Sequence, residues 1–448
     1  MGRIGTIAGA SVLGALIATS LVSCENPLQT FIIDTLFGAP YQRQMARLDP
    51  DPNLGSFGFS VDISGDYMIV GEPNRDGGKG GATIYHRTSG EAWDAGTPVP
   101  APAGALGPHS TNAEDGDQYG VAVATDGTFA VIGSMYSGDV AGVKRGRVVI
   151  YKRDATNGLW TSVSEFGLAD IPGATPAALD YDMFGNAISI DGNWMAIGAR
   201  QDQNGVVDDS CGAVYLFQNV GGTWTYKEKH RAPVPQDGAA FGFSVDLSGD
   251  LFIVGSHYED LEGIPVTSPY RQGAAYIFRF DTDNWQFSEK ITASSPAHMA
   301  LFGVSVGISG DYAVVGSPLQ AAGSVAEAGA IHLYQRSSLD DWLANPAVEL
   351  TLPNPTGGDW FGFSATIWGD QVLASSFNRD DAGANAGAVY LYSRTDGNAW
   401  ELADTLTASD ASDNGYFGMA LAMDGTRAVI GATAPPPAAS AGAVYIFK

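Results

Sequence analysis

Residues 241–278, FGFSVDLSGDLFIVGSHYEDLEGIPVTSPYRQGAAYIF, are the clearest copy of a unit that recurs along most of the chain. Each copy has an aromatic-Gly pair, an alternating run, a polar turn, an apolar run, a variable loop and a third run after Gly-Ala. The pairs lie about 60 residues apart, and self-similarity at a fixed period marks a repeat architecture. The seven pairs begin at Phe57, Tyr119, Phe184, Phe241, Phe302, Phe361 and Phe417.

The first copy shows which strands the unit contains. Residues 57–63 alternate apolar with polar side chains, as a half-buried strand does, and residues 64–66 (Ser-Gly-Asp) have turn chemistry. Residues 67–70 and 81–86 predict a second and a third strand, and Trp93 is predicted to begin a fourth. Four short antiparallel strands per unit, repeated seven times, predict an all-β fold, a seven-bladed β-propeller.

The last copy ends at Lys448, directly after its third strand, so it lacks an outer strand of its own. Residues 42–48 match the segment that precedes the other copies, and we expect them to supply this strand. Closure matters because an open array would leave strand edges and apolar blade faces in water. We therefore expect residues 41–448 to form one closed propeller. Tryptophans are predicted to open the fourth strands of the other six copies: Trp93, Trp160, Trp224, Trp285, Trp342 and Trp400.

The composition is that of a folded, acidic protein, with 45% hydrophobic residues and 58 glycines. The formal net charge of −26 gives a surface that repels nucleic acid, so binding of DNA or RNA is not expected. The acidity either serves solubility or attracts a cationic partner. The two cysteines, Cys24 and Cys211, are not expected to pair, and the propeller is expected to be monomeric.

The first 23 residues have the features of a secretory signal peptide: Arg3 supplies positive charge, an apolar stretch follows, and a small residue precedes Cys24. Residues 21–24, Leu-Val-Ser-Cys, resemble the bacterial lipobox, which implies cleavage before Cys24 and acylation of its thiol. The alternative is an uncleaved transmembrane anchor, but the stretch is barely long enough and lacks positive charge after it. Stable anchoring takes more than one acyl chain, and the resemblance implies a diacylglycerol and an N-acyl group.

Residues 24–40 are then the lipidated cysteine and a linker, and the protein is expected to be exported and tethered to the bacterial envelope through its lipid anchor. Glu25 follows the cysteine and favours sorting to the outer membrane or cell surface over the inner membrane.

The repeat itself resembles a known family. Phe-Gly, the strand that ends in Val-Gly-Ser-Pro at residues 315–318, and Gly-Ala-Val-Tyr resemble the FG-GAP repeat of integrin α-subunit propellers, and the bacterial branch is most similar. Integrin blades often carry a calcium loop, DxDxDGxxxD, between their first two strands. Here that place holds a short turn such as residues 248–250, which cannot surround a calcium ion with six to eight ligands. No metal and no cofactor are expected.

The variable loops between second and third strands all emerge at one face of the ring, together with the loops that lead into the next blade. We call this the loop face, and the opposite one, where the short turns emerge, the turn face. Function concentrates on variable loops held by a rigid scaffold, and the loop of the fourth copy is the longest. The predicted contact residues are His257, Tyr258, Glu259, Asp260, Tyr270 and Arg271; the alternative is an ordinary surface insertion.

Carboxylates also recur before the aromatic-Gly pairs. Asp117, Asp182 and Asp359 stand two residues before their pairs, and Asp237 and Asp413 stand four before theirs. One interpretation is an acidic ring at the channel mouth that binds cations or basic groups. The other, which we favour, is that each carboxylate accepts local backbone N–H bonds and holds its loop.

The chain contains no HExxH, GxSxG, CxxC or phosphate-binding glycine loop, so no catalytic residue is predicted and an enzyme is not expected. Three hypotheses remain. The first is a recognition or adhesion scaffold for protein or glycan, which the near-uniform blades favour. The second is an enzyme acting on extracellular polysaccharide with Asp182 and Asp359 across the channel. The third is a structural subunit of an envelope assembly.

Overall fold

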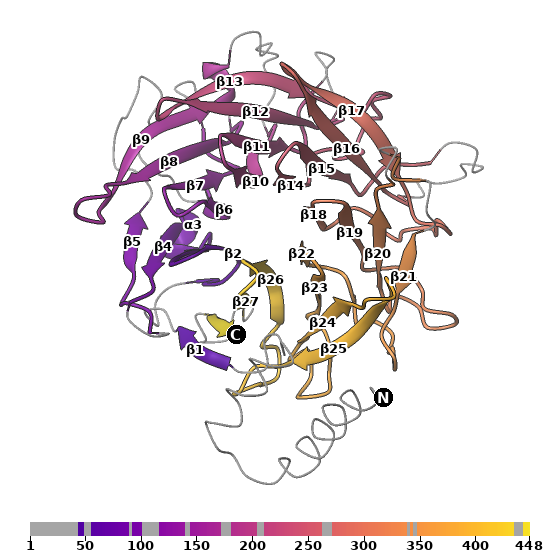
Figure 1. Cartoon of the computed structure of the whole chain (residues 1–448). Helices are drawn as coiled ribbons and strands as arrows, with labels where there is room; N and C mark the ends of the chain where they lie inside the picture. The colour runs from indigo at the N-terminus through magenta and orange to yellow at the C-terminus, as the bar shows by residue number, and fades with distance from the viewer. Residues whose placement is uncertain are drawn as a thin grey trace, which may run out of the picture.

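The computed structural model describes residues 44–48, 55–88, 92–100, 116–138, 144–171, 181–203, 210–261, 271–337, 341–343, 347–433 and 442–448. Within these ranges seven four-stranded antiparallel sheets stand as blades around a central axis (Figure 1). In each of the first six blades the strands follow one another in chain order, from the axis to the rim. The predicted all-β, seven-bladed propeller is therefore confirmed.

The strands have the following bounds. Blades one to three contain β2 Ser60–Ser64, β3 Tyr67–Gly71, β4 Gly81–His86, β5 Thr97–Pro100; β6 Tyr119–Thr125, β7 Phe129–Ser134, β8 Arg147–Arg153, β9 Trp160–Gly167; and β10 Phe184–Asp191, β11 Trp194–Ala199, β12 Ala213–Val220, β13 Thr223–His230. Blades four to six contain β14 Ser244–Ser248, β15 Leu251–Ser256, β16 Ala274–Asp281, β17 Asn284–Ile291; β18 Val306–Ser309, β19 Tyr312–Ser317, β20 Ala330–Gln335, β21 Val348–Leu350; and β22 Ala365–Trp368, β23 Gln371–Ser376, β24 Ala388–Arg394, β25 Trp400–Leu406. Blade seven contains β26 Phe417–Met423, β27 Ala428–Ala432, β28 Ala443–Phe447 and β1 Gln44–Leu48, and the described helical segments are α3 Arg75–Gly78 and η1 Leu168–Asp170.

The ring closes through the N-terminal strand, as the sequence predicts. β1 pairs antiparallel with β28, with Gln44 opposite Phe447 and Leu48 opposite Val444. Strands from opposite ends of the described chain thus complete one sheet, beside the C-terminus in Figure 1. Because β1 covers the outer edge of β28, blade seven does not expose the unpaired backbone of an interrupted sheet.

The backbones of neighbouring blades are in direct contact, and the glycines that recur at regular positions in the repeat make this close approach possible. At the junction of blades four and five, Phe302 N donates to Gln272 O at 3.0 Å. A Cβ on Gly273, whose φ is +84°, would overlap the carbonyl oxygen of Phe302, and a Cβ on Gly255 would overlap that of Gly303. The aromatic-Gly and Gly-Ala pairs therefore form an interlocking joint. Equivalent parallel bridges join Phe57 to Gly442, Tyr119 to Gly80, Phe184 to Gly146, Phe241 to Gly212 and Phe361 to Gly329.

The tryptophans pack each blade against the preceding one. Trp224 of blade three meets Phe129 of blade two edge to face, with ring centroids 5.5 Å apart, and Trp285 of blade four meets Trp194 of blade three at 5.4 Å. Trp160 and Trp400 begin their strands as predicted. The prediction is wrong for Trp93 and Trp342, which precede strands that begin at Thr97 and Val348. Fully buried Trp342 shows that this position is fixed by packing and not by strand pairing.

The first two strands of each blade are joined by short turns. Ser248 lies opposite Leu251 across the turn of blade four, and Gly249 in this turn has a φ of +60°. A turn of this length has no room for the six to eight oxygen ligands of a calcium ion. The antiparallel order places these turns at the turn face and the second-to-third-strand loops at the loop face.

Candidate functional site

The predicted loop of blade four begins with a stack of side chains at the junction with blade three. The His257 ring contacts the rings of Phe243 and Tyr258, with centroids 4.0 and 3.9 Å apart and planes tilted by 54° and 43°. The guanidinium carbon of Arg271 lies 4.4 Å from the centroid of Tyr258, and that of Arg200 lies 5.3 Å from Phe243. The two cations thus cover the aromatic rings that flank the imidazole. We call these five residues the blade-four stack.

The stack is held by the scaffold beneath it. Asn186 donates from Nδ2 to the carbonyl oxygens of Gly242 and Phe243, both at 3.0 Å, and accepts from Arg200 N at 3.0 Å. Tyr258 N donates to Ala239 O at 3.2 Å. Tyr258 is 37% exposed, so the rigid stack presents an aromatic side chain to solvent.

His257 is the least ordinary member of the stack. It is only 4% exposed, and its Nδ1 has no hydrogen-bond partner within the described part of the chain. Burial, with help from the nearby charges of Arg200 and Arg271, lowers the pKa of His257 to about 3. The imidazole is therefore neutral at physiological pH. Both guanidinium groups lie near enough to disfavour its protonation.

Glu259 and Asp260, also predicted contacts, hold the loop instead. Glu259 is 4% exposed, accepts from Tyr276 Oη at 2.7 Å and pairs with Lys290 Nζ at 2.6 Å. Asp260 accepts from the backbone N–H of Arg271 at 2.6 Å. Among the predicted contacts of this loop, Tyr258 and Arg271 are the ones that are partly exposed in the stack, and Tyr270 lies outside the described residues.

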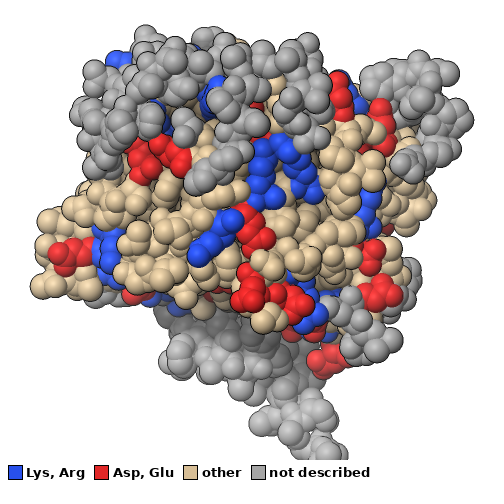
Figure 2. Space-filling model, turned by 90° about the horizontal axis from the view of Figure 1, so that it is seen from above, with Lys and Arg blue, Asp and Glu red and all other residues tan. Residues whose placement is uncertain are grey.

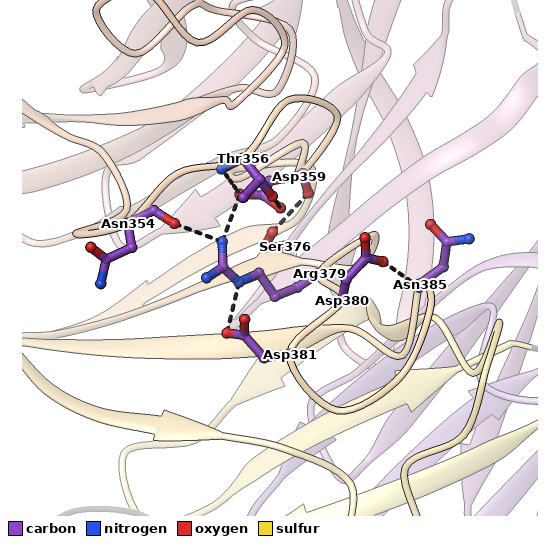
Figure 3. A network of polar contacts seen from close by, with 8 residues as sticks. All are labelled: Asn354, Thr356, Asp359, Ser376, Arg379, Asp380, Asp381 and Asn385. Atoms are coloured by element: carbon purple, nitrogen blue, oxygen red, sulfur yellow. Dashed lines mark hydrogen bonds and ion pairs between the residues drawn. The ribbon is translucent and has the colours of Figure 1, made fainter.

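Asp359 is the centre of a comparable loop-holding network in blade six (Figure 3). It is 2% exposed and accepts from Thr356 N and Oγ1, both at 2.6 Å, and from Arg379 Nη1 at 2.8 Å. Arg379 also donates to Asn354 O at 2.9 Å and to Asp381 at 2.8 Å. These contacts tie the loop that leads into blade six to the loop between its second and third strands.

The other carboxylates before the aromatic-Gly pairs are also engaged locally. Asp117 is 3% exposed, and its backbone oxygen accepts from Ser134 Oγ at 2.9 Å. Burial and the nearby Asp202 raise the pKa of Asp182 to about 6, although Arg145, at 4.0 Å, opposes this. These positions favour the loop-holding interpretation over an open acidic ring. Asp237 accepts from Ser210 N, and Asp413 accepts from Ala384 N.

The channel itself contains a pair of carboxylates that the sequence interpretation missed. A hollow of about 470 Å³ is lined by the second halves of the innermost strands, towards the turn face, and it includes Asp62 and Asp246. Asp62 accepts from Thr125 N of the next blade at 2.6 Å, and Asp246 accepts from Ile308 N of the next blade at 2.8 Å. Burial raises the pKa of Asp62 to about 7 and that of Asp246 to about 6.

A signal for this pair is present in the repeat. Asp62 and Asp246 stand five residues after the aromatic residue of their copies, where the other copies have Ala124, Ser189, Gly307, Thr366 and Ala422. Comparing the copies position by position would have singled them out.

The predicted signal peptide, the lipidated Cys24 and the linker, residues 1–40, lie outside the described residues. In the part of the chain that the structure describes, no helix is long and apolar enough to cross a membrane. Across the same residues, no three His, Cys, Asp or Glu side chains gather in a way that would hold a metal ion.

Together, the closed ring and its loop-bearing face define a β-propeller scaffold of the kind that presents binding residues on loops. A family model for the FG-GAP repeat matches residues 54–85, 177–217, 224–278, 285–334, 347–392 and 400–447. The chain belongs to the FG-GAP repeat family. Blade two lies between the matched segments, and it has Tyr119 in place of phenylalanine and Arg147 in place of alanine. No curated protein matches the chain.

Proposed function

We propose that this protein is a recognition scaffold of the bacterial envelope, tethered through Cys24, that binds a protein or glycan ligand through the loop face. The observation that carries the proposal is the blade-four stack, in which a rigid framework presents the partly exposed ring of Tyr258. Aromatic side chains that are fixed before binding lose little conformational entropy on contact, and they dominate recognition surfaces.

The family supports a binding role and not a catalytic one. Of the two carboxylates of the enzyme hypothesis, Asp359 is paired with Arg379 at 2.8 Å, and Asp182 has Arg145 at 4.0 Å. Function in a propeller is therefore best sought on the loops. The export signal and lipobox of residues 1–24 support a location where an extracellular polymer or an envelope protein is the available partner.

The test is a binding screen with the full chain in a non-ionic detergent, against a glycan array and against solubilised envelope proteins. We expect saturable binding that is lost in Tyr258→Ala. Tyr67→Ala is the matched control, because Arg153 covers the Tyr67 ring at 4.6 Å on the turn face, much as Arg271 covers Tyr258. Absence of binding in both screens, or equal loss in the two variants, would overturn the proposal.

A further inference from the structure

We propose that the blade-four stack binds the acidic group of an anionic glycan, a uronate carboxylate or a sulfate ester, with the sugar against the exposed part of Tyr258. This inference rests on the proposed recognition function and names its ligand class. It starts from the two cations of the stack. Among the residues that the structure describes, no carboxylate pairs with the guanidinium of Arg200 or of Arg271, although Asp and Glu outnumber Lys and Arg by 49 to 23 in the sequence.

Three other cations of the loop face are paired with carboxylates. Arg379 pairs with Asp359 and Asp381, Lys290 pairs with Glu259, and Lys229 pairs with Asp202. A guanidinium presents a planar fork of N–H donors that matches a carboxylate or a sulfate. Arg200 donates from Nε to Met183 Sδ at 3.0 Å. The remaining N–H donors of Arg200 and those of Arg271 keep this capacity for a ligand, because no carboxylate of the described residues pairs with either guanidinium.

His257 adds a second, independent indication of a ligand. Its Nδ1 is buried and unpaired within the described part of the chain, and such an atom costs about 1–3 kcal/mol unless a partner reaches it. A neutral imidazole offers one donor and one acceptor, which suits the hydroxyl groups of a sugar. The stack thus combines cations for an acidic group, the exposed part of an aromatic side chain, and a buried nitrogen that a ligand hydroxyl reaches only when the rings around it move apart.

The size of the site favours a glycan over a protein. Its exposed described part consists of Arg200, Tyr258 and Arg271, whereas a stable protein interface involves about 20–30 residues on each side. One acidic sugar unit is large enough to contact the exposed part of Tyr258 and the cation beside it.

The net charge of the chain does not prevent this binding. At physiological ionic strength, charges more than about 8 Å apart are largely screened, so the local cations dominate at the stack. On the side of the ring drawn in Figure 2, Lys and Arg side chains lie among Asp and Glu and not behind a continuous acidic surface.

The experiment is titration calorimetry of the full chain in non-ionic detergent with four probes at moderate salt. The probes are oligogalacturonate for carboxylate, sulfated dextran for sulfate, neutral dextran, and poly-L-glutamate for an acidic peptide. We expect one or both acidic glycans to bind, to weaken as salt rises, and to bind at least tenfold more weakly to Arg271→Gln and to Arg200→Gln. The matched control is Arg153→Gln, which removes a ring-covering arginine of the turn face and leaves the affinity unchanged.

The outcomes separate this inference from the broader one. Binding of neutral dextran or of an envelope protein that depends on Tyr258, without binding of either acidic glycan, overturns the anionic class and leaves the recognition function standing. Preference for poly-L-glutamate also overturns it, because the partner is then a peptide. If no probe, glycan or protein binds the unaltered chain, both proposals fail. Equal losses in Arg271→Gln and Arg153→Gln would show that the stack is not the site.

Discussion

Asp62 makes the stability of the ring depend on pH in a direction opposite to that of a salt-bridged carboxylate. Burial raises its pKa from 3.8 to about 7 in the folded state, with smaller contributions from Asp246 and Asp126. Its contribution to stability is therefore fully present below pH 4, where both states are protonated, and is lost as the pH rises through 7. The full pKa difference corresponds to about 4 kcal/mol. Because Asp62 is half-buried and lines a hollow that water enters, we expect about half of this, roughly 2 kcal/mol.

The assay is thermal unfolding followed by circular dichroism between pH 4 and pH 8. An unfolding entropy of about 2 cal/mol/K per residue converts 2 kcal/mol into a fall in Tm of about 2–3 °C for a propeller of this length. Asp62→Asn removes the titrating group. It also places an amide NH2 group against one of the two backbone N–H groups, those of Ile63 and Thr125, that donate to the carboxylate. We expect it to be about 1 kcal/mol less stable than the unaltered protein at pH 5 and to show a flatter profile up to pH 8.

Two further variants complete this test. Asp246→Asn should flatten the profile around pH 6, where its carboxylate titrates, and Thr366→Ala, which changes the equivalent channel-lining position of blade six and carries no titrating group, should leave it unchanged. Identical pH profiles for the unaltered protein and Asp62→Asn would refute the reasoning, because the carboxylate would then ionise equally easily in the folded and unfolded chains.

Three other predictions concern the contacts that hold the ring and its loops together. Gly255→Ala should lower the free energy of unfolding, measured by urea titration, by more than about 3 kcal/mol, because its Cβ overlaps the next blade. Gly249→Ala, in open space at positive φ, should cost about 1 kcal/mol in the same titration. Arg379→Ala should cost about 3–5 kcal/mol, because it leaves a buried carboxylate without its cation, and Arg336→Ala, at an exposed pair, should cost less than 1 kcal/mol. Removal of residues 1–48 should open the ring and cause self-association through β28, while removal of residues 1–43 should leave a monomer by light scattering.

The ring could be predicted from the sequence because its joints are encoded by residue type. Backbone-to-backbone contact at each junction requires glycine, so Gly255 and Gly273 mark the junction before any coordinates exist. The spacing of such pairs fixes the number of blades, and the strand missing from the last copy identifies its replacement in β1. The first copy has two adjacent glycines, Gly80 and Gly81, so the sequence alone does not show which of them forms the joint with the next blade. In the structure Gly80 forms the bridge to Tyr119, and it is therefore the equivalent of Gly212.

The binding site was only partly predictable, because side-chain direction within a loop does not follow from loop length. The sequence pointed to the correct loop, but it could not show that Glu259 turns inward to Tyr276 while Tyr258 stays exposed. Arg200 was missed because it belongs to the preceding blade and meets the loop only after the ring forms. Asp359 was predicted, but its partner Arg379 was not, because Arg379 lies in the next loop of the same blade and meets the carboxylate only in the folded blade.

Function in a ring of near-identical blades has to come from the positions where the copies differ. The glycine joints cannot vary without overlap between blades, and the Phe-Gly aromatics are buried, so neither is free to evolve a ligand contact. What remains is the fifth position after the aromatic residue, which faces the channel, and the loops. Blades one and four both have a carboxylate at the fifth position, Asp62 and Asp246, and blade four adds the stack around His257 on the loop side. This concentration of departures in one blade is the reason to look there first for a ligand.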